Sequence, residues 1–506
     1  MELDGGVLIL RGGLVVDPRA GTQRVADVVV DGGQVVAVGT PPPGDPERYS
    51  QADVIDVTGL VVGPGFVDVH SHVHSIAGQR LQALDGVTTT LDLEAGLMPI
   101  ETAYARAADE GRPLHYGFSA SWGDARARAH LGTAPAADLN ASLAMLGDPE
   151  WQRTSSSSER AVWLDLLESE LAAGALGIGV LMGYAPRSDP AEFLAVARLA
   201  AATGTGTFTH VREIVEADPT TPIDGSSEIT RAAAETGARM HHCHVNSTSR
   251  RHVDRVLGVI EGARTSGSSV TVETYPYGAG STAIGAYFLA PERLPAWGLR
   301  PTDISLVATG ERVADLSRLE ELRVTDPGAV CVVRFLDEDD PSDAAMLTRS
   351  LAFPDAIVAS DAMHVLWPDG STDSREWPLP PGGQTHPRTA GTFARSLRRM
   401  VRESGAWTWA EAFRRCSYLP AQLVADFAPS ARVKGWLDVG ADADVVVIDP
   451  TRLTDQATYV DPTRPSVGVV HLLVDGQLVV HDGTLVTDAY PGRPVRGVPQ
   501  GSRTTV

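Results

Sequence analysis

Two histidines separated by one residue, His70 and His72, are the clearest sign of chemistry in this 506-residue chain. They end the apolar run GPGFVDVHSH, residues 63–72. Residues two apart on a β-strand project to the same side, so we expect both imidazoles to face one point. Such a pair is well suited to bind a metal ion. A His-X-His pair also occurs on ordinary surfaces, so its meaning depends on the other strand ends.

Later apolar runs end in residues of matching chemistry. Glu94 ends the second run, His210 and His244 lie at the ends of two later ones, and Asp361 ends the last. If these runs are the parallel strands of one barrel, their C-terminal ends meet at the rim where barrel active sites lie. Nitrogen and oxygen ligands together suit a borderline ion such as Zn²⁺. We therefore predict a site for one or two zinc ions, with the ligands His70, His72, Glu94, His210, His244 and Asp361.

Alternating strand-like and helix-like segments provide the frame for these residues. Eight strands separated by Ala-, Leu- and Arg-rich helical stretches are the sequence pattern of an α/β fold, the (β/α)8 TIM-like barrel. Ser156 and Glu159 have the spacing of a capping box at the start of one such helix. The expected strands are residues 65–72, 87–94, 115–122, 175–182, 205–211, 239–246, 270–277 and 356–361.

Short valine-rich strands occupy both ends of the chain, separated by Gly, Asp and Pro turn residues. This texture predicts a small discontinuous β-sandwich built from both termini. Two long segments, between the seventh and eighth strands and directly after the eighth, would carry substrate contacts. The expected domains are a sandwich from residues 1–62 and 425–490, a catalytic barrel over 63–424 with an insertion at 278–355, and a loosely ordered tail at 491–506.

Composition places the chain among soluble globular enzymes. The net charge of −22 disfavours nucleic acid or an anionic membrane as a partner. Three scattered cysteines give no disulfide framework, and we find neither a signal peptide nor an apolar run of about 18 residues that would span a membrane. We expect a cytoplasmic protein whose partner is a small molecule, and leave open whether it forms a homo-oligomer.

A set of motifs follows in order along the chain: PGFVDVHSH (64–72), GVTTT (86–90), GALGIG (174–179), THVR (209–212), VTVETYPYGAGST (270–282), HPR (386–388) and GADADVVVID (440–449). As an ordered set they resemble the amidohydrolase superfamily, and most closely its D-aminoacylase (N-acyl-D-amino-acid deacylase) branch. The resemblance implies that His70, His72 and Asp361 surround one metal position, and His210 and His244 a second. A metal-bound water would attack an amide carbonyl, with Asp361 first accepting its proton and then returning it to the leaving nitrogen.

The chain departs from this family where the two metals would be bridged. The superfamily often uses a carboxylated lysine on the fourth strand, but residues 177–182 read GIGVLM. The branch uses a cysteine instead, and that position aligns with Ala95. We favour Glu94 as the bridging ligand, because a carboxylate can bind two cations through its two oxygens. Alternatively, Glu94 or Asp92 only supports a ligand histidine through a hydrogen bond. A site that holds a single metal ion is a further alternative.

The substrate side also departs from the branch. Asn246 stands where the branch commonly carries a lysine facing the substrate carboxylate, so the acid group of the substrate would be blocked, absent or held differently. Arg388 matches an arginine suited to bidentate carboxylate binding. One tyrosine of the Tyr-Pro-Tyr run would polarise the scissile carbonyl, and Arg212 would contact substrate or pair with Glu213 or Glu216. The expected substrate contacts are Tyr275, Tyr277, Arg388, Asn246 and Arg212.

We therefore predict a metal-dependent hydrolase of a linear acyl amide, such as an N-acyl-D-amino acid. One alternative is a cyclic amide or imide hydrolase similar to hydantoinase or dihydroorotase, which the missing fourth-strand lysine disfavours. Another is a non-catalytic scaffold that kept the barrel. Such scaffolds typically lose metal ligands, whereas this chain keeps all of His70, His72, His210, His244 and Asp361.

Overall fold

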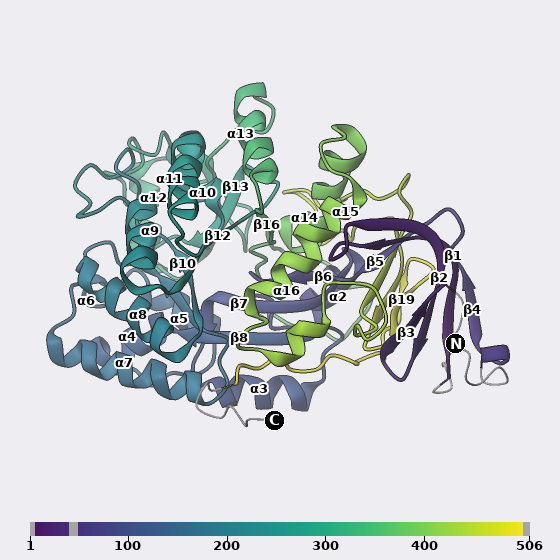
Figure 1. Cartoon of the computed structure of the whole chain (residues 1–506). Coiled ribbons are helices and arrows are strands. Elements are labelled where there is room, and N and C mark those ends of the chain that lie inside the picture. The colour runs from purple at the N-terminus through teal and green to yellow at the C-terminus, as the bar shows by residue number, and fades with distance from the viewer. Residues whose placement is uncertain (1–5, 40–48, 499–506) are drawn as a thin grey trace.

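A parallel sheet of eight strands forms the centre of the molecule (Figure 1). The computed structural model describes residues 6–39 and 49–498, so parts of the expected sandwich and tail lie outside the described residues. Strands adjacent in the chain are adjacent in the sheet, which confirms the predicted barrel. The strands are β6 (Phe66–Asp68), β7 (Val87–Leu97), β8 (His115–Ser121), β9 (Ile178–Leu181), β10 (Gly206–His210), β11 (Arg239–His242), β12 (Val270–Thr274) and β16 (Ile357–Val358).

The first and last barrel strands meet just beyond their C-terminal ends. The backbone N–H of His72 donates to the carbonyl of Ala362 at 2.8 Å, and Ser71 and Ala362 form a parallel bridge. Below this point the carboxylate of Asp68 accepts a hydrogen bond from the backbone N–H of Ser360 at 2.9 Å. The barrel is therefore closed by the segments that carry the expected ligands.

Helices surround the barrel between successive strands. The Ser156 hydroxyl accepts from the N–H of Glu159 at 3.2 Å and the Glu159 side chain accepts in return, which confirms the capping box. No helix among the described residues is long and apolar enough to cross a bilayer. The helices before the eighth strand, apart from its preceding insertion, are α2 (Ile76–Leu84), α3 (Ile100–Glu110), α4 (Trp122–Leu131), α5 (Leu139–Met145), α6 (Pro149–Gln152), α7 (Ser157–Ala172), α8 (Pro190–Thr203), α9 (Gly225–Thr236), α10 (Val245–Ser249) and α11 (Val253–Thr265).

The insertion before the eighth strand is a small antiparallel sheet with two helices. The middle strand, β15 (Val330–Arg334), pairs with both β13 (Ala279–Ala283) and β14 (Ile304–Leu306). The helices are α12 (Leu316–Thr325) and α13 (Pro341–Ala352). After the eighth strand the chain returns through α14 (Arg388–Leu397), α15 (Trp409–Phe413) and α16 (Leu419–Val424).

Both ends of the chain form one nine-stranded sheet beside the barrel, seen as purple and yellow strands in Figure 1. Strand β17 pairs antiparallel with β5, which joins the two halves. Val62 and Val447 pack in a core formed mainly by residues of this sheet. Val61 and Val446 pack in a second core, which they share with Phe66 of the barrel. The strands are β1 (Leu8–Asp17), β2 (Thr22–Asp31), β3 (Gln34–Val38), β4 (Asp53–Asp56), β5 (Val61–Pro64), β17 (Val445–Ile448), β18 (Val469–Val474), β19 (Gln477–His481) and β20 (Thr484–Leu485).

The start of the expected loose tail is firmly packed. The N–H of Val495 donates to the carbonyl of Tyr116 at 2.7 Å, and that of Gly497 to Gly174 at 2.9 Å. The Val495 side chain is buried. This segment lies against the starts of two barrel strands, so the expectation of loose order is wrong for residues 491–498.

Candidate metal centre

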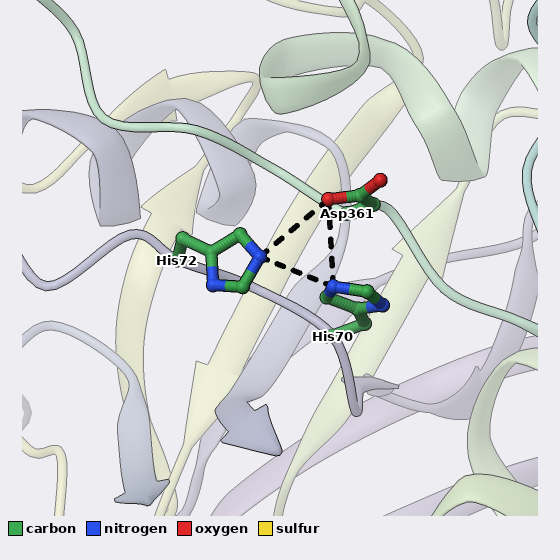
Figure 2. A group of neighbouring side chains, drawn as sticks. All are labelled: His70, His72 and Asp361. Atoms are coloured by element: carbon green, nitrogen blue, oxygen red, sulfur yellow. Dashed lines mark hydrogen bonds and ion pairs between the residues drawn. The ribbon is translucent and has the colours of Figure 1, made fainter. Parts of the chain in front are cut away.

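His70, His72 and Asp361 converge at the seam of the barrel, the place where its first and last strands meet (Figure 2). The Nε2 atoms of the two histidines lie 3.1 Å apart, and Asp361 Oδ1 lies 3.4 Å from His70 Nε2 and 3.6 Å from His72 Nε2. Two ligands each about 2.1 Å from a tetrahedral zinc ion are roughly 3.4 Å apart. The spacing of these three buried atoms therefore fits a shared metal ion.

Glu94 lies between this group and a second pair of histidines. Its Oε2 is 3.2 Å from His70 Nε2, whereas its Oε1 is 2.6 Å from His244 Nε2 and 3.2 Å from His210 Nδ1. The Nδ1 atom of His210 is buried, and its contact with Glu94 does not have the geometry of a hydrogen bond. A buried imidazole nitrogen that makes no hydrogen bond and a carboxylate with one oxygen toward each histidine pair are the donor set of a two-ion site.

The backbone bends sharply where two of these residues leave their strands. His244, just after β11, has φ of 32°, and Asp361, just after β16, has φ of 52°. Non-glycine residues in the left-handed region cost free energy, and such residues cluster at functional sites. Both bends direct the side chains toward the centre of the rim.

Two carboxylates behind the histidines set their orientation. Glu273 Oε1 pairs with His70 Nδ1, and Asp92 Oδ1 lies 3.2 Å from His72 Nδ1. Each imidazole can thus donate from Nδ1 and present the lone pair of Nε2 to the centre. Burial would raise the pKa of Glu273, but His70 beside it holds that pKa well below its usual range.

Sequence reasoning missed Glu273. Glu273 Oε2 lies 2.9 Å from His241 Nε2 and its Oε1 pairs with His70, so this carboxylate joins the two imidazoles. A charged residue inside the apolar β12 was the available signal. One alternative from the sequence was that Asp92 supports a ligand histidine, and Asp92 does contact His72 Nδ1. Glu94 nevertheless also lies between the two histidine pairs.

Arg388 and Tyr275 lie beside Asp361. The buried Arg388 guanidinium places Nη2 2.9 Å from Asp361 Oδ1 and lies 5.0 Å from the centre of the Tyr275 ring. Burial would raise the pKa of Asp361, and Arg388 brings that pKa below its usual value. The Tyr275 hydroxyl is buried and has no hydrogen-bond partner. Arg388 therefore stabilises the charged form of Asp361 directly.

Three other expected substrate contacts have partners inside the protein. Arg212 donates two hydrogen bonds of 2.9 Å to Glu228, rather than pairing with Glu213 or Glu216. Asn246 Oδ1 accepts from Thr274 Oγ1 at 3.1 Å. Tyr277 packs against Arg395. Arg212, Asn246 and Tyr277 do not line the cavity at the metal centre, so their positions do not support substrate contact.

A cavity opens onto the metal centre. His72, Glu94, His210, His244 and Asp361 all line it. Its other walls are mainly apolar and come from β8, β9, α5, α6 and the insertion. Apolar walls with a few convergent polar groups are typical of a small-molecule site.

A family model described as "Amidohydrolase family" matches residues 53–480. N-acyl-D-glutamate deacylase from Alcaligenes xylosoxydans xylosoxydans is 29% identical, over 98% of this chain and 99% of the relative. D-aminoacylase from the same organism is also 29% identical, over 96% of each. N-acyl-D-glutamate deacylase from Bordetella bronchiseptica, solved with zinc and a phosphonate inhibitor, has a TM-score of 0.74 and 24% identity, covering 97% of this chain and 99% of that one.

Proposed function

This chain belongs to the amidohydrolase family, and from that premise we propose that it is a metal-dependent hydrolase of linear acyl amides, with N-acyl-D-amino acids as the first candidates. The observation that supports this proposal most directly is the position of Glu94, whose two carboxylate oxygens face two separate pairs of histidines. The relatives named N-acyl-D-glutamate deacylase and D-aminoacylase, each matched over nearly its whole length, support the substrate class.

The ligand set fits two zinc ions. His70, His72 and Asp361 would hold one, His210 and His244 the other, and Glu94 would lie between them. The zinc in a solved relative supports this assignment. Bound zinc polarises a carbonyl and makes water a nucleophile at neutral pH.

The remaining steps belong to side chains of the protein. Asp361 would accept the proton of the attacking water and return it to the leaving nitrogen, because it is kept ionised by Arg388 and faces the cavity. The Tyr275 hydroxyl, which lines the same cavity, would donate to the carbonyl oxygen as negative charge develops there.

A substrate panel tests this proposal. Zinc-loaded protein would be given N-acetyl-D- and N-acetyl-L-amino acids, simple N-acyl amines, a hydantoin and dihydroorotate, with Asp361→Asn as the control. We expect free amine from a linear amide, and loss of at least a thousandfold in kcat for the variant. Turnover of cyclic substrates alone, or an active Asp361→Asn variant, would contradict the proposal.

A further inference from the structure

The cavity continues beyond the metal centre on one side, where Leu139, Leu143, Leu146, Trp151 and Leu181 line it. Asp361 and Tyr275 line the side formed by β16 and β12. In the sheet order β9 lies four strands from β16, so it is on the opposite side of the barrel. There the cavity continues over β8 and β9 to α5 and α6. We call this opposite end the apolar chamber, with walls from Leu139, Leu143, Leu146, Trp151 and Leu181.

The chamber offers no charged partner to a ligand. Among the described residues that line the whole cavity there is no lysine or arginine, and the two carboxylates, Glu94 and Asp361, belong to the metal centre. The polar groups in the chamber wall are already bonded: Trp151 Nε1 donates to the Gly123 carbonyl at 3.0 Å, and Ser142 Oγ to Asp124 at 2.6 Å. An unpaired buried charge is costly, so this end favours an apolar occupant.

The position of Asp361 decides which part of the substrate enters the chamber. The leaving nitrogen must lie beside Asp361 to receive its proton, so the amine half lies on the β16 side. The acyl half then extends across the rim toward β8 and β9. We propose that the apolar chamber binds the acyl chain, and that the preferred substrates carry a medium-length alkyl acyl group rather than acetyl. This inference rests on the proposed function.

Gly123 gives a direct way to test the chamber. A Cβ at this position would lie 3.7 Å from each of Leu181 Cδ1, Ser121 Oγ and Trp151 Cζ2, all ordinary van der Waals contacts. Gly123 lies in the first turn of α4 and is not in the left-handed region. A larger side chain would therefore fit onto the backbone here and fill chamber volume. Gly258, exposed on α11 with no atom near its Cβ position, is the matched control.

The experiment measures kcat/KM for N-acetyl, N-butanoyl, N-hexanoyl and N-octanoyl forms of the best amine from the panel. Each buried methylene is worth about fourfold, so we expect the hexanoyl form to exceed acetyl by on the order of a hundredfold. Gly123→Leu should lower the hexanoyl-to-acetyl ratio at least tenfold, while Gly258→Leu keeps it. Leu143→Asn, which makes the chamber wall polar, should lower the same ratio if Gly123→Leu does not fold.

A flat acyl profile, or a ratio unchanged in both chamber variants, would overturn the inference. A profile that instead follows the length of the amine substituent would overturn the assignment of the two ends. Calorimetric binding of octanoate and acetate to the zinc-loaded protein separates this inference from the proposed function. Tighter octanoate binding that Gly123→Leu removes supports the chamber even without turnover, and equal binding of the two acids overturns it.

Discussion

The guanidinium of Arg388 lies 2.9 Å from Asp361, the carboxylate at the seam of the barrel. Both side chains are buried, and Asp361 also faces His70 and His72. The arginine therefore acts on the charge of the proposed proton carrier before any substrate binds. A residue expected to bind only substrate is thus part of the support of the metal centre.

Replacing Arg388 separates its charge from its shape. Arg388→Met leaves the buried Asp361 without its cation, so we expect kcat/KM to fall at least a hundredfold and the unfolding free energy to fall by about 3–5 kcal/mol. Arg388→Lys keeps the charge and should lose less in both. Steady-state kinetics and urea denaturation measure these changes, and equal losses in the two variants would argue against a charge effect.

Glu94 should control how many metal ions the protein retains. Glu94→Ala removes the carboxylate between the two histidine pairs, so we expect the metal content of dialysed protein to fall by about half, measured by atomic emission. Ala95 lines the cavity beside it, and Ala95→Cys in the Glu94→Ala background should restore part of the metal. Unchanged metal content in Glu94→Ala would show that Glu94 does not bridge.

Glu273 should affect metal affinity without touching substrate. Glu273→Gln weakens the hydrogen bond that orients His70, and we expect zinc affinity to fall about 10–100-fold. Competition with a zinc chelator measures this. Thr271→Val is the matched control, because Thr271 Oγ1 bonds His241 at 2.7 Å and does not contact His70. A similar loss in both variants would indicate a general effect of β12.

Asp444 should make the free energy of unfolding depend on pH in the acidic range. It lies 2.6 Å from Lys434 Nζ and 2.9 Å from His115 Nε2, and although burial would raise the pKa of Asp444, these partners hold it well below its usual range. An unfolded aspartate takes up its proton near pH 4, before the folded one does, so this stabilisation is present above about pH 4 and lost below it.

The variant Asp444→Asn tests this sign. We expect its unfolding free energy to be lower than that of the natural protein by about 3–5 kcal/mol at pH 7, and the difference to shrink below about pH 4. Urea denaturation of chelator-treated protein across this range measures the difference. A constant difference from pH 3 to pH 7 would contradict the pairing.

The sequence predicted the parts of the molecule that depend on local pattern. His70, His72 and Glu94 end apolar runs, and parallel strands bring such ends to one rim, so their meeting follows from topology. The partners of long side chains do not follow in this way. Arg212, which follows β10, pairs with Glu228 of α9. No residue spacing in the sequence indicates that these two side chains meet. Glu273 was missed for the same reason.

The seam between β6 and β16 has a consequence for how the site comes into existence. Asp68 and Ser360, which hydrogen-bond across it, are 292 residues apart in the chain. His72 and Asp361 lie on opposite sides of the same junction. A chain with seven strands assembled and the eighth still free would have histidines but no complete ligand set. Pairing of these two segments brings Asp361 to the histidines, so closure of the barrel and completion of the proposed ligand set are the same event.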